Sequence, residues 1–439
     1  MMEKPKTVTD PGRVDVLAKQ IRDGALSPVE LVQHYLDRIE TVEPQVEAWR
    51  ELCADAALEE ATIQETEIRS GTIRGPLHGI PVGVKDIIDV AGVPTRCNSK
   101  SRADAAPATA DAEVVTALRV AGAIILGKTH TTEFAFRDIS PARNPYNLDH
   151  TPGGSSSGSG AAVSAGMVPV ALGTQTMASV NRPAAYCGIA AFKPSTRLMP
   201  GGGVAPLSYL YDTVGFYGWS VADAATVFEA ICPSHARMHR IAATDSALNI
   251  TVLQDPFIEN ANSDIHKSID QTEASLKEAD YNVVRQDAPI DIAALQELHR
   301  LTMEYDIGHT QKGLLDEPEG SVGSFLCEAI RRGLETSVGE YAEGRRAIDI
   351  ARHTFFNHFP ETDAFIWPAT PKTAPKGLEW TGDASYISPW TALGGPVVTM
   401  PVGLSSEKMP IGCLVAGTPG SDYRFASMAR KIADAAETH

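Results

Sequence analysis

Helix-type stretches followed directly by strand-type stretches recur along this sequence and constrain its fold more than any other feature. Residues 111–121 carry valine and leucine on one helical face, and the apolar run 123–126 follows at once. The same order returns at 161–167 and 168–173. This alternation is typical of a mostly parallel or mixed sheet with helices packed on it. We therefore expect an α/β fold: a single large domain whose central, mixed, twisted β-sheet is covered by helices on both faces.

Other segments fit this architecture. Ser27-Pro28-Val29-Glu30 is a good helix start, with Ser as N-cap and Glu three residues on, and we expect that helix to end at Pro44. Further helices are predicted over 51–70, 264–279 and 421–437, and strands over 80–84, 249–254, 282–285, 364–367 and 396–402. We expect one domain over 1–439, with a core at about 70–230 and 361–439 and a helical, substrate-side cover at about 250–360.

The charge balance disfavours several classes of partner. Lys plus Arg number 38 and Asp plus Glu 55, which gives a net charge of −17. An acidic surface repels phosphate groups, so we expect neither nucleic acid nor a membrane as the main partner. The first residues carry no apolar signal region, and no apolar run approaches the roughly 18 residues that a membrane span needs. We therefore expect a cytoplasmic protein.

Cysteine and histidine spacing gives no sign of a metal site. The six cysteines are scattered without a CxxC pair, so we expect reduced, mostly buried thiols. His235 and His239 have the spacing of two ligands on one helix turn, but no third ligand is in view. We expect these two histidines to serve the surface or the packing.

The densest run of small residues is the Gly/Ser block Gly153–Gly160. Such a run is a functional loop or a linker, and the apolar stretch directly after it argues against a linker. A phosphate-binding loop would need a Lys-Ser or Lys-Thr pair, which the block lacks. Residues 122–129 do fit GxxxxGK[ST], but a helix precedes them and their middle residues are strand-like, the reverse of the usual order.

A second interpretation of the block is a nucleophile elbow, because residues 154–158 match GxSxG with Ser156 at the centre. That arrangement needs a later acid and histidine, such as His299, His353 or His358. An elbow also follows a strand directly, whereas residues 141–152 are loop-like.

A third interpretation uses three separate places in the chain. Lys85 ends an apolar strand, where a cation is costly unless it is paired or neutral. The serines at 155–157 form the second place. In the third, a strand leads into the small-residue turn before Ser179, which is a good position for a nucleophile beside free backbone N–H groups.

In this order the three places resemble the amidase signature family. The resemblance rests on GIPVGVKD, TPGGSSSGSGAAVSAG and GTQTMASV followed by RPAAYCGIAAFKPS, with weaker similarity over nearly the whole chain. It implies a Ser–Ser–Lys triad with Ser179 as nucleophile, Ser155 as the bridging serine after a cis peptide bond, and Lys85 as base. It also implies support from Ser156, Thr174, Gln175 and Asn181, and no metal or organic cofactor.

The implied chemistry is coherent. A serine hydroxyl needs a base, and burial lowers the pKa of a lysine so that its neutral form is populated. Ser155 would relay the proton from Ser179 to Lys85 and return it to the leaving nitrogen. The backbone N–H groups of Thr176, Met177, Ala178 and Ser179 would form the oxyanion hole.

The sequence departs from the family pattern at two points. Met177 and Ala178 replace the usual pair of glycines. If the backbone needs a positive φ at either position, the side chain there costs stability. If it does not, the substitution only narrows the acyl pocket. Gln175 and Asn181 replace a common Asp and Arg, which we interpret as a neutral hydrogen-bonded bracket in which Arg182 takes part of the role.

Other polar and aromatic residues are open to two interpretations. Trp367, Trp380 and Trp390 would line an aromatic substrate channel or pack in the core. Asp212 is expected to be a structural acceptor rather than an acid. Residues that select the substrate are expected within about 130–150, 200–220 and 290–390.

The sequence thus predicts a hydrolase of amide or carbamate C–N bonds, acting on a small molecule such as an aryl amide, an anilide or a small urethane, with esterase side activity. One alternative is a glutamyl-tRNA amidotransferase A-like subunit, which would need partner subunits. Another is a catalytically silent binding protein on the same scaffold. A homodimer is compatible with each of these.

Overall fold

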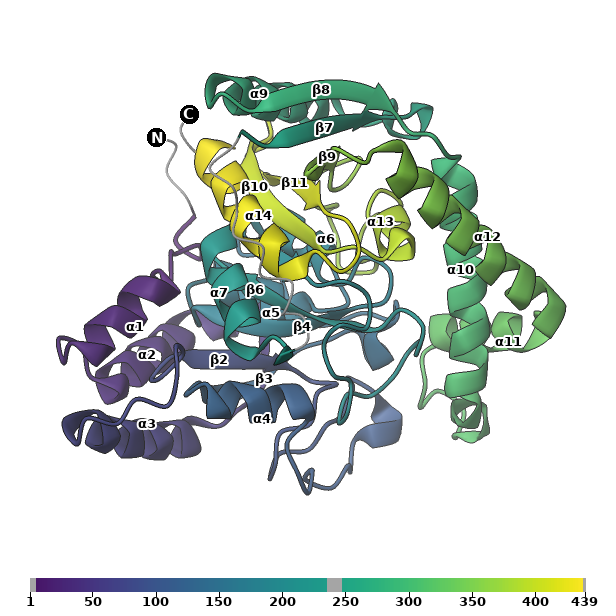
Figure 1. Ribbon diagram of the computed structural model, residues 1–439. Helices are drawn as coiled ribbons and strands as arrows, with labels where there is room; N and C mark the ends of the chain where they lie inside the picture. Colours follow the sequence, from purple (N-terminus) through teal and green to yellow (C-terminus); the bar gives the residue numbers. More distant parts are fainter. Residues whose placement is uncertain (1–4, 235–246, 437–439) are drawn as a thin grey trace.

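The computed structural model describes residues 5–234 and 247–436, which contain one mixed sheet of 11 strands (Figure 1). The strand order is β1-β3-β2-β4-β6-β5-β10-β11-β9-β7-β8. The strands are β1 (Trp49–Leu52), β2 (Pro81–Lys85), β3 (Ile124–Thr129), β4 (Val170–Gln175), β5 (Ala190–Lys193), β6 (Thr213–Gly218), β7 (Asn249–Gln254), β8 (Asn282–Asp287), β9 (Ala364–Pro368), β10 (Val397–Leu404) and β11 (Pro410–Ala416).

Two groups of parallel strands flank an antiparallel centre. In the first group β2 pairs with both β3 and β4, and in the second β7 pairs with both β8 and β9. Antiparallel pairs from β4 through β6, β5, β10 and β11 to β9 join the groups. The expected mixed sheet in a single domain is therefore confirmed.

Helices account for a large share of the described residues outside the strands. They are α1 (Val14–Arg22), α2 (Pro28–Val46), α3 (Ala54–Arg69), α4 (Glu113–Val120), α5 (Ser157–Ser164), α6 (Asn181–Cys187), α7 (Val221–Ile231), α9 (Ser263–Glu278), α10 (Ile292–Thr310), α11 (Ser324–Glu335), α12 (Val338–His358), α13 (Ser388–Leu393) and α14 (Asp422–Ala436). Short 3₁₀ turns are η1 (Lys100–Arg102), η2 (Glu133–Ala135), η3 (Pro256–Ile258) and η4 (Lys312–Asp316).

Helices cover the sheet from both sides. Helices α7, α9 and α14 form one group, in which α14 packs against both of the others, while α5 and α6 pack together against other parts of the same sheet. Helix α10 packs against both α11 and α12, and the three helices form an arm beside the sheet, seen at the right of Figure 1. Helix α13 joins this arm to the sheet region by contacting α10 and α12.

The helical cover is shorter than the expected 250–360. Strands β7 and β8 fall within that range and belong to the central sheet, so the helical cover consists of α10, α11 and α12. The crossover from β7 through α9 to β8 forms a parallel unit at the sheet edge, as is usual when a helix connects two parallel strands.

The predicted helix start at Ser27 is confirmed, but its predicted end is wrong. The Ser27 side chain accepts from the N–H groups of Val29 and Glu30, and the capping box is complete. Pro44 lies inside α2, which continues to Val46. A proline near the end of a helix removes a single backbone hydrogen bond, and the burial of the last turn against the core offsets that loss.

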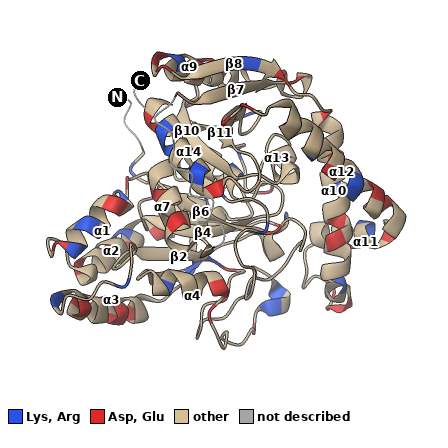
Figure 2. Ribbon diagram, viewed as in Figure 1, with Lys and Arg blue, Asp and Glu red and all other residues tan. Residues whose placement is uncertain are grey.

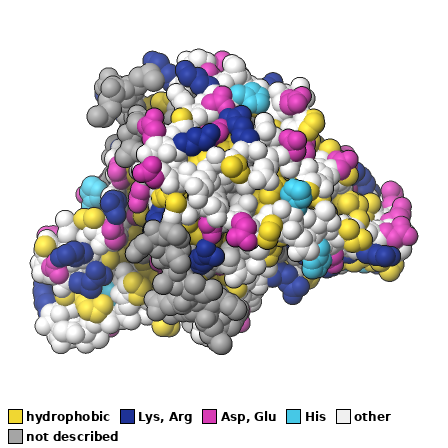
Figure 3. All heavy atoms as spheres, turned by 45° about the horizontal axis from the view of Figure 1, so that its top comes forward, with side chains coloured by type: hydrophobic (Ala, Val, Ile, Leu, Met, Phe, Trp, Pro, Cys, Tyr) yellow, Lys and Arg dark blue, Asp and Glu magenta, His cyan; other side chains and the backbone are white. Residues whose placement is uncertain are grey.

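Burial agrees with the expected state of the thiols. All six cysteines are free, and four of them, Cys97, Cys187, Cys232 and Cys413, are buried. Acidic and basic residues alternate along helices such as α1 and α12 (Figure 2). On the face drawn in Figure 3, hydrophobic side chains are scattered among charged and other residues.

Candidate active site

Lys85 is the last residue of β2 and is completely buried. Its Nζ donates to the Oγ of Ser155 at 2.7 Å and to the Oγ1 of Thr174 at 2.8 Å. Burial lowers the pKa of Lys85 to about 7, while the charge of the Asp212 carboxylate acts in the opposite direction. A lysine with this pKa is partly neutral near pH 7, as a general base must be.

The Gly/Ser block begins as a loop and then enters a helix. The Gly154–Ser155 peptide bond is cis, as the resemblance implies, and α5 already begins at Ser157. The Oγ of Ser156 donates to the carbonyl of Thr174 and accepts from its N–H, both at 3.2 Å. Ser156 therefore joins the hydrogen-bond network of the buried lysine through Thr174.

Two glycines make this close packing possible. A Cβ on Gly158 would lie 2.2 Å from the carbonyl oxygen of Ala48 and 2.4 Å from the backbone nitrogen of His130. A Cβ on Gly173 would lie 2.7 Å from the Oγ of Ser156. The density of small residues here thus reflects backbone that packs directly against its neighbours.

Ser179 lies in the turn between β4 and α6 and is 7% exposed. Its carbonyl accepts from the hydroxyl of Tyr217 at 3.0 Å and from the N–H of Ser156 at 3.4 Å. Within the described part of the chain, no hydrogen bond has an N–H of residues 176–179 as its donor. Four consecutive free N–H groups beside a serine are what an oxyanion-binding turn requires.

The turn before Ser179 does not require glycine at positions 177 and 178. Neither Met177 nor Ala178 has a positive φ, so a side chain causes no backbone strain at either position. Met177 lines a cavity together with Ser179. Of the two expected consequences of replacing the glycines, the narrowed pocket is the one that the structure supports.

Gln175 and Asn181 form the expected neutral bracket. The Nε2 of Gln175 donates to the Oδ1 of Asn181 at 2.9 Å and to the Oγ1 of Thr391 at 3.0 Å. The Oε1 of Gln175 accepts from the N–H groups of Val180 and Asn181 at 2.8 and 3.0 Å. The bracket thus hydrogen-bonds backbone N–H groups at the start of α6 without using a charged side chain.

Arg182 has a different role from the expected one. Instead of contacting the bracket, its Nε and Nη2 donate to the carbonyl of Gly154 at 3.2 and 2.7 Å, and its Nη1 donates to the carbonyl of Gly382 at 2.5 Å. Burial lowers the pKa of Arg182 to about 10. This guanidinium therefore binds the carbonyl oxygen of the cis Gly154–Ser155 peptide itself.

Asp212 is a structural acceptor, as expected. Its carboxylate accepts from the Oγ1 of Thr176 at 2.5 Å and from the N–H groups of Leu207 and Ser208 at 2.7 and 3.1 Å. Burial raises the pKa of Asp212 to about 6. Its charge still influences Lys85, so the residue links the turn to the buried lysine electrostatically.

His299 and Thr391 also contact the turn, and neither was identified from the sequence as a neighbour of Ser179. The Nε2 of His299 lies 3.1 Å from the carbonyl oxygen of Thr176, and the Oγ1 of Thr391 donates to the carbonyl of Met177 at 2.7 Å. Both residues come from distant segments without a local motif. The sequence offered no signal for these contacts beyond the presence of the residues.

A cavity of about 260 Å³ opens beside Ser179. Its walls include the turn itself and residues from each of the three segments that we expected to select the substrate: Phe136, Leu207, Met303 and Trp380. Trp380 thus lines the cavity, whereas Trp367 and Trp390 are buried in a core cluster. Of the three tryptophans, Trp380 is thus the one placed where an aromatic channel would need it.

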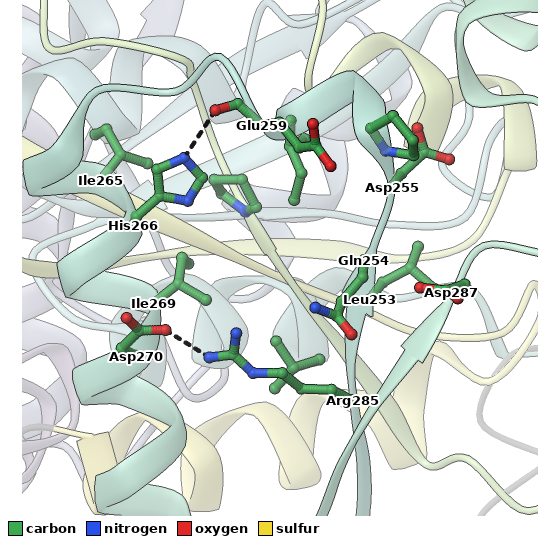
Figure 4. A pocket seen from close by; sticks show the side chains of 14 residues that line it. Leu253, Gln254, Asp255, Glu259, Ile265, His266, Ile269, Asp270, Arg285 and Asp287 are labelled. Carbon is green, nitrogen blue, oxygen red and sulfur yellow. Dashed lines mark hydrogen bonds and ion pairs between the residues drawn. The ribbon is translucent and has the colours of Figure 1, made fainter.

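A larger cavity of about 440 Å³ lies elsewhere, between the carboxyl ends of β7 and β8 and helix α9 (Figure 4). Charged side chains such as Asp255, Glu259 and Asp287 line it, and Arg285 is paired there with Asp270 at 2.5 Å. No residue that the sequence predicted for catalysis lines this cavity. The candidate site is therefore the smaller cavity beside Ser179.

The two other interpretations of the small-residue motifs do not fit the structure. Ser156 binds the main chain of Thr174, and His299 binds the carbonyl of Thr176, so this serine and histidine do not form an elbow pair. Residues 124–129 of the P-loop-like string form strand β3. That string therefore makes no loop at a helix start.

The described residues offer neither a metal cluster nor a membrane span. In residues 5–234 and 247–436, no group of three or more His, Cys, Asp or Glu side chains could hold a metal ion. The pair His235 and His239 lies outside the described residues. None of the described helices combines the length and the apolar character that crossing a bilayer requires.

Comparisons with known proteins find relatives over nearly the whole chain. The family model described as "Amidase" matches residues 30–425. The A component of the glutamyl-tRNA(Gln) amidotransferase from a Picosynechococcus species is 27% identical over 92% of this chain and 94% of its own length. The native peptide amidase from Stenotrophomonas maltophilia superposes with a TM-score of 0.80 at 28% identity, covering 96% of each chain. A chain from a vestigial complex, described as revealing the evolutionary origins of an s-triazine catabolic enzyme, has a TM-score of 0.88 at 25% identity, covering 96% of this chain and 98% of its own.

Proposed function

Because this chain belongs to the amidase signature family, we propose that it hydrolyses the C–N bond of a small amide or carbamate through an acyl-enzyme on Ser179. The observation that carries the proposal is the buried hydrogen bond from Lys85 to Ser155, close to a turn with free N–H groups. A buried lysine with a pKa of about 7 is suited to take a proton.

The proposed reaction has two halves. In the first, the Oγ of Ser179 attacks the substrate carbonyl while its proton passes to Ser155 and the proton of Ser155 passes to Lys85. The N–H groups of residues 176–179 bind the oxyanion, and the C–N bond breaks as the proton returns to the leaving nitrogen. In the second half, water attacks the acyl-enzyme, loses its proton along the same path, and releases the acid and free Ser179.

The cavity supports a small substrate with an apolar part. Its volume of about 260 Å³ is slightly below the usual range for drug-sized ligands. Met177, Leu207, Met303 and Trp380 supply apolar wall, and Trp380 offers a ring on which an aryl group can stack. Aryl amides, anilides and small urethanes fit this description, and aryl esters would react as more easily cleaved analogues.

The second candidate is an amidotransferase component that works only with partners. The name and full-length similarity of the Picosynechococcus relative favour it. The net charge of −17 argues against a tRNA surface. A silent binding protein is the third candidate, and retention of Lys85, Ser155 and Ser179 together argues against it.

The test is hydrolysis of a chromogenic panel by the purified chain and by Ser179→Ala. The panel holds nitroanilides, aryl carbamates and nitrophenyl esters, and Ser406→Ala, which changes an exposed serine, is the matched control. We expect the wild type and the control to be active and Ser179→Ala to lose activity by on the order of 10³-fold or more. Labelling by a fluorophosphonate should map to Ser179.

Other results would point elsewhere. Full activity in Ser179→Ala would place the nucleophile at another residue. A wild type that is inactive alone but hydrolyses glutamine once partner proteins are added would favour the amidotransferase. A folded wild type that is inert to every acyl donor and to the phosphonate would favour the binding protein.

A further inference from the structure

The turn before Ser179 is held through two consecutive backbone carbonyls. The carbonyl of Thr176 contacts the Nε2 of His299 at 3.1 Å, and the carbonyl of Met177 accepts from the Oγ1 of Thr391 at 2.7 Å. His299 belongs to α10 and Thr391 to α13, two helices that contact each other. The arm that lies beside the sheet thus reaches the backbone of the turn directly.

The contact with Thr176 requires a proton on the Nε2 of His299, and burial keeps the ring neutral. A carbonyl oxygen can only accept, so the Nε2 of His299 carries the proton. The Nδ1 then accepts from the hydroxyl of Ser388, whose Oγ lies 3.2 Å away. The histidine is completely buried, and burial lowers its pKa to about 4, so the ring is neutral near pH 7.

Neighbouring residues restrict the ring further. The ring of Tyr211 packs on that of His299 with 4.3 Å between centroids, and the hydroxyl of Tyr211 lies 2.6 Å from the Oγ1 of Thr302. The next residue, Asp212, accepts from the side chain of Thr176 at 2.5 Å. The side chain and the carbonyl of Thr176 are therefore both held by buried groups.

Carbonyl contacts determine where the N–H groups point. The C=O and the N–H of a trans peptide point in opposite directions, and the peptides of this turn are trans. A carbonyl of Thr176 held by His299 turns the N–H of Met177 to the opposite side. A carbonyl of Met177 held by Thr391 does the same for the N–H of Ala178. Neither N–H donates to another described residue, and both residues line the cavity with Ser179.

We propose that His299 is a positioning residue for the oxyanion-binding turn, a role that rests on the proposed acyl transfer at Ser179. The histidine does not line the cavity beside Ser179 and acts through the Thr176–Met177 peptide. Thr391 performs the same task on the next peptide. Because the donors are oriented before the substrate arrives, reorganisation does not add to the barrier.

The experiment compares His299→Leu with His299→Gln. Leucine has a similar size and no donor, whereas the amide of glutamine can donate to Thr176 and accept from Ser388. For an aryl amide we expect kcat of the leucine variant to fall about 10- to 100-fold, which is less than the loss of a complete oxyanion donor. We expect KM to stay within a few-fold, and the glutamine variant to recover most of the loss. His309→Leu, at an exposed position of the same helix, is the control and should resemble the wild type.

A second measurement separates positioning from general damage. A trifluoromethyl ketone forms a tetrahedral adduct whose oxyanion occupies the hole, so its affinity should fall in proportion to kcat in the leucine variant. The affinity for the product acid should change little. If the leucine variant does not fold, Thr391→Val against Thr391→Ser tests the same mechanism through the carbonyl of Met177.

The outcomes for the two proposals are distinct. An active wild type whose leucine variant keeps its kcat and its ketone affinity overturns the role of His299 alone. Equal losses in the leucine and glutamine variants, or a change confined to KM, overturn it as well. A wild type that neither hydrolyses the panel nor forms an adduct dependent on Ser179 overturns the proposed function, and the role of His299 with it.

Discussion

The Nζ of Lys85 lies 2.7 Å from the Oγ of Ser155, and both side chains are completely buried. A charged ammonium in this position would lack the hydration that it has in water, so the neutral amine is favoured relative to an exposed lysine. The Asp212 carboxylate partly opposes this effect, and the two influences together bring the pKa of Lys85 to about 7. The protonation state of this pair should therefore control activity near neutral pH.

The first prediction concerns the acid limb of the pH profile. If neutral Lys85 is the base, kcat/KM for an amide should rise with pH through about 7. Asp212→Asn removes a negative charge that stabilises the protonated lysine, so the limb should move to lower pH, by up to about one unit. Rate profiles between pH 5 and 9 measure this. Asp306→Asn, which changes a carboxylate bound to Ser208 and Leu210, serves as the control. An unchanged limb, or one at higher pH, would contradict the role of Asp212.

The second prediction concerns the acyl pocket. Met177 lines the cavity beside Ser179, and Met177→Gly should admit larger acyl groups. We expect the ratio of kcat/KM for a benzoyl ester to that for an acetyl ester to rise about 10-fold or more. The glycine should also cost about 1 kcal/mol of unfolding free energy, since it frees the unfolded backbone. A ratio that does not move would place the acyl group on another wall of the cavity.

The third prediction concerns the neutral bracket. Gln175→Glu keeps the size of the side chain but places a carboxyl group beside the Oδ1 of Asn181, with no cation in the bracket. We expect a loss of about 3 kcal/mol in unfolding free energy. Burial should raise the pKa of the new carboxyl group in the folded chain above its value in the unfolded chain. The unfolded chain then loses this proton more readily as the pH rises, so the loss of stability should be larger at pH 8 than at pH 5. Gln286→Glu on the exposed strand β8 is the comparison and should change stability little. Equal stability of the two variants at pH 8 would refute the prediction.

The fourth prediction concerns the close contact of α5. Gly158→Ala would place a Cβ 2.2 Å from the carbonyl oxygen of Ala48, so backbone must move. We expect a loss of about 3 kcal/mol or more, seen as a lower Tm or as insoluble protein. Gly313→Ala, where no atom lies within 4 Å of the new Cβ, should be neutral or slightly stabilising. A Gly158→Ala variant with the Tm of the wild type would show that the two backbones separate easily.

The motif-bearing part of the site was predictable from the sequence because it is local. Lys85, Ser155 and Ser179 each lie in or next to a short sequence motif. Close packing restricts the residue types in such motifs, because a Cβ at Gly158 or Gly173 would clash with neighbouring atoms. The cis bond before Ser155 followed from the resemblance and is present. The roles of these residues in catalysis stay predictions until the variants are measured.

The supporting contacts were not predictable because they depend on tertiary structure. His299 reaches Thr176 only because the arm of helices packs beside the sheet, and no spacing in the sequence encodes that contact. Strand β6 was also missed, since its two glycines, Gly215 and Gly218, weaken the strand pattern. Tertiary packing explains why glycine is present in this strand despite its low strand propensity. A Cβ on Gly215 would lie within 3 Å of the side chain of Val180.

The contact between Arg182 and the carbonyl of Gly382 has a consequence for synthesis of the chain. Translation delivers Lys85, Ser155 and Ser179 long before Gly382 and Thr391 leave the ribosome. Until then the carbonyls of Gly154 and Met177 lack part of their final support, and β5 lacks its neighbour β10. If Ser179 is the nucleophile, a nascent chain that contains Lys85, Ser155 and Ser179 but not yet Gly382 would therefore still be a poor catalyst. Hydrolytic competence would arrive late in biosynthesis, once the last strands have joined the sheet.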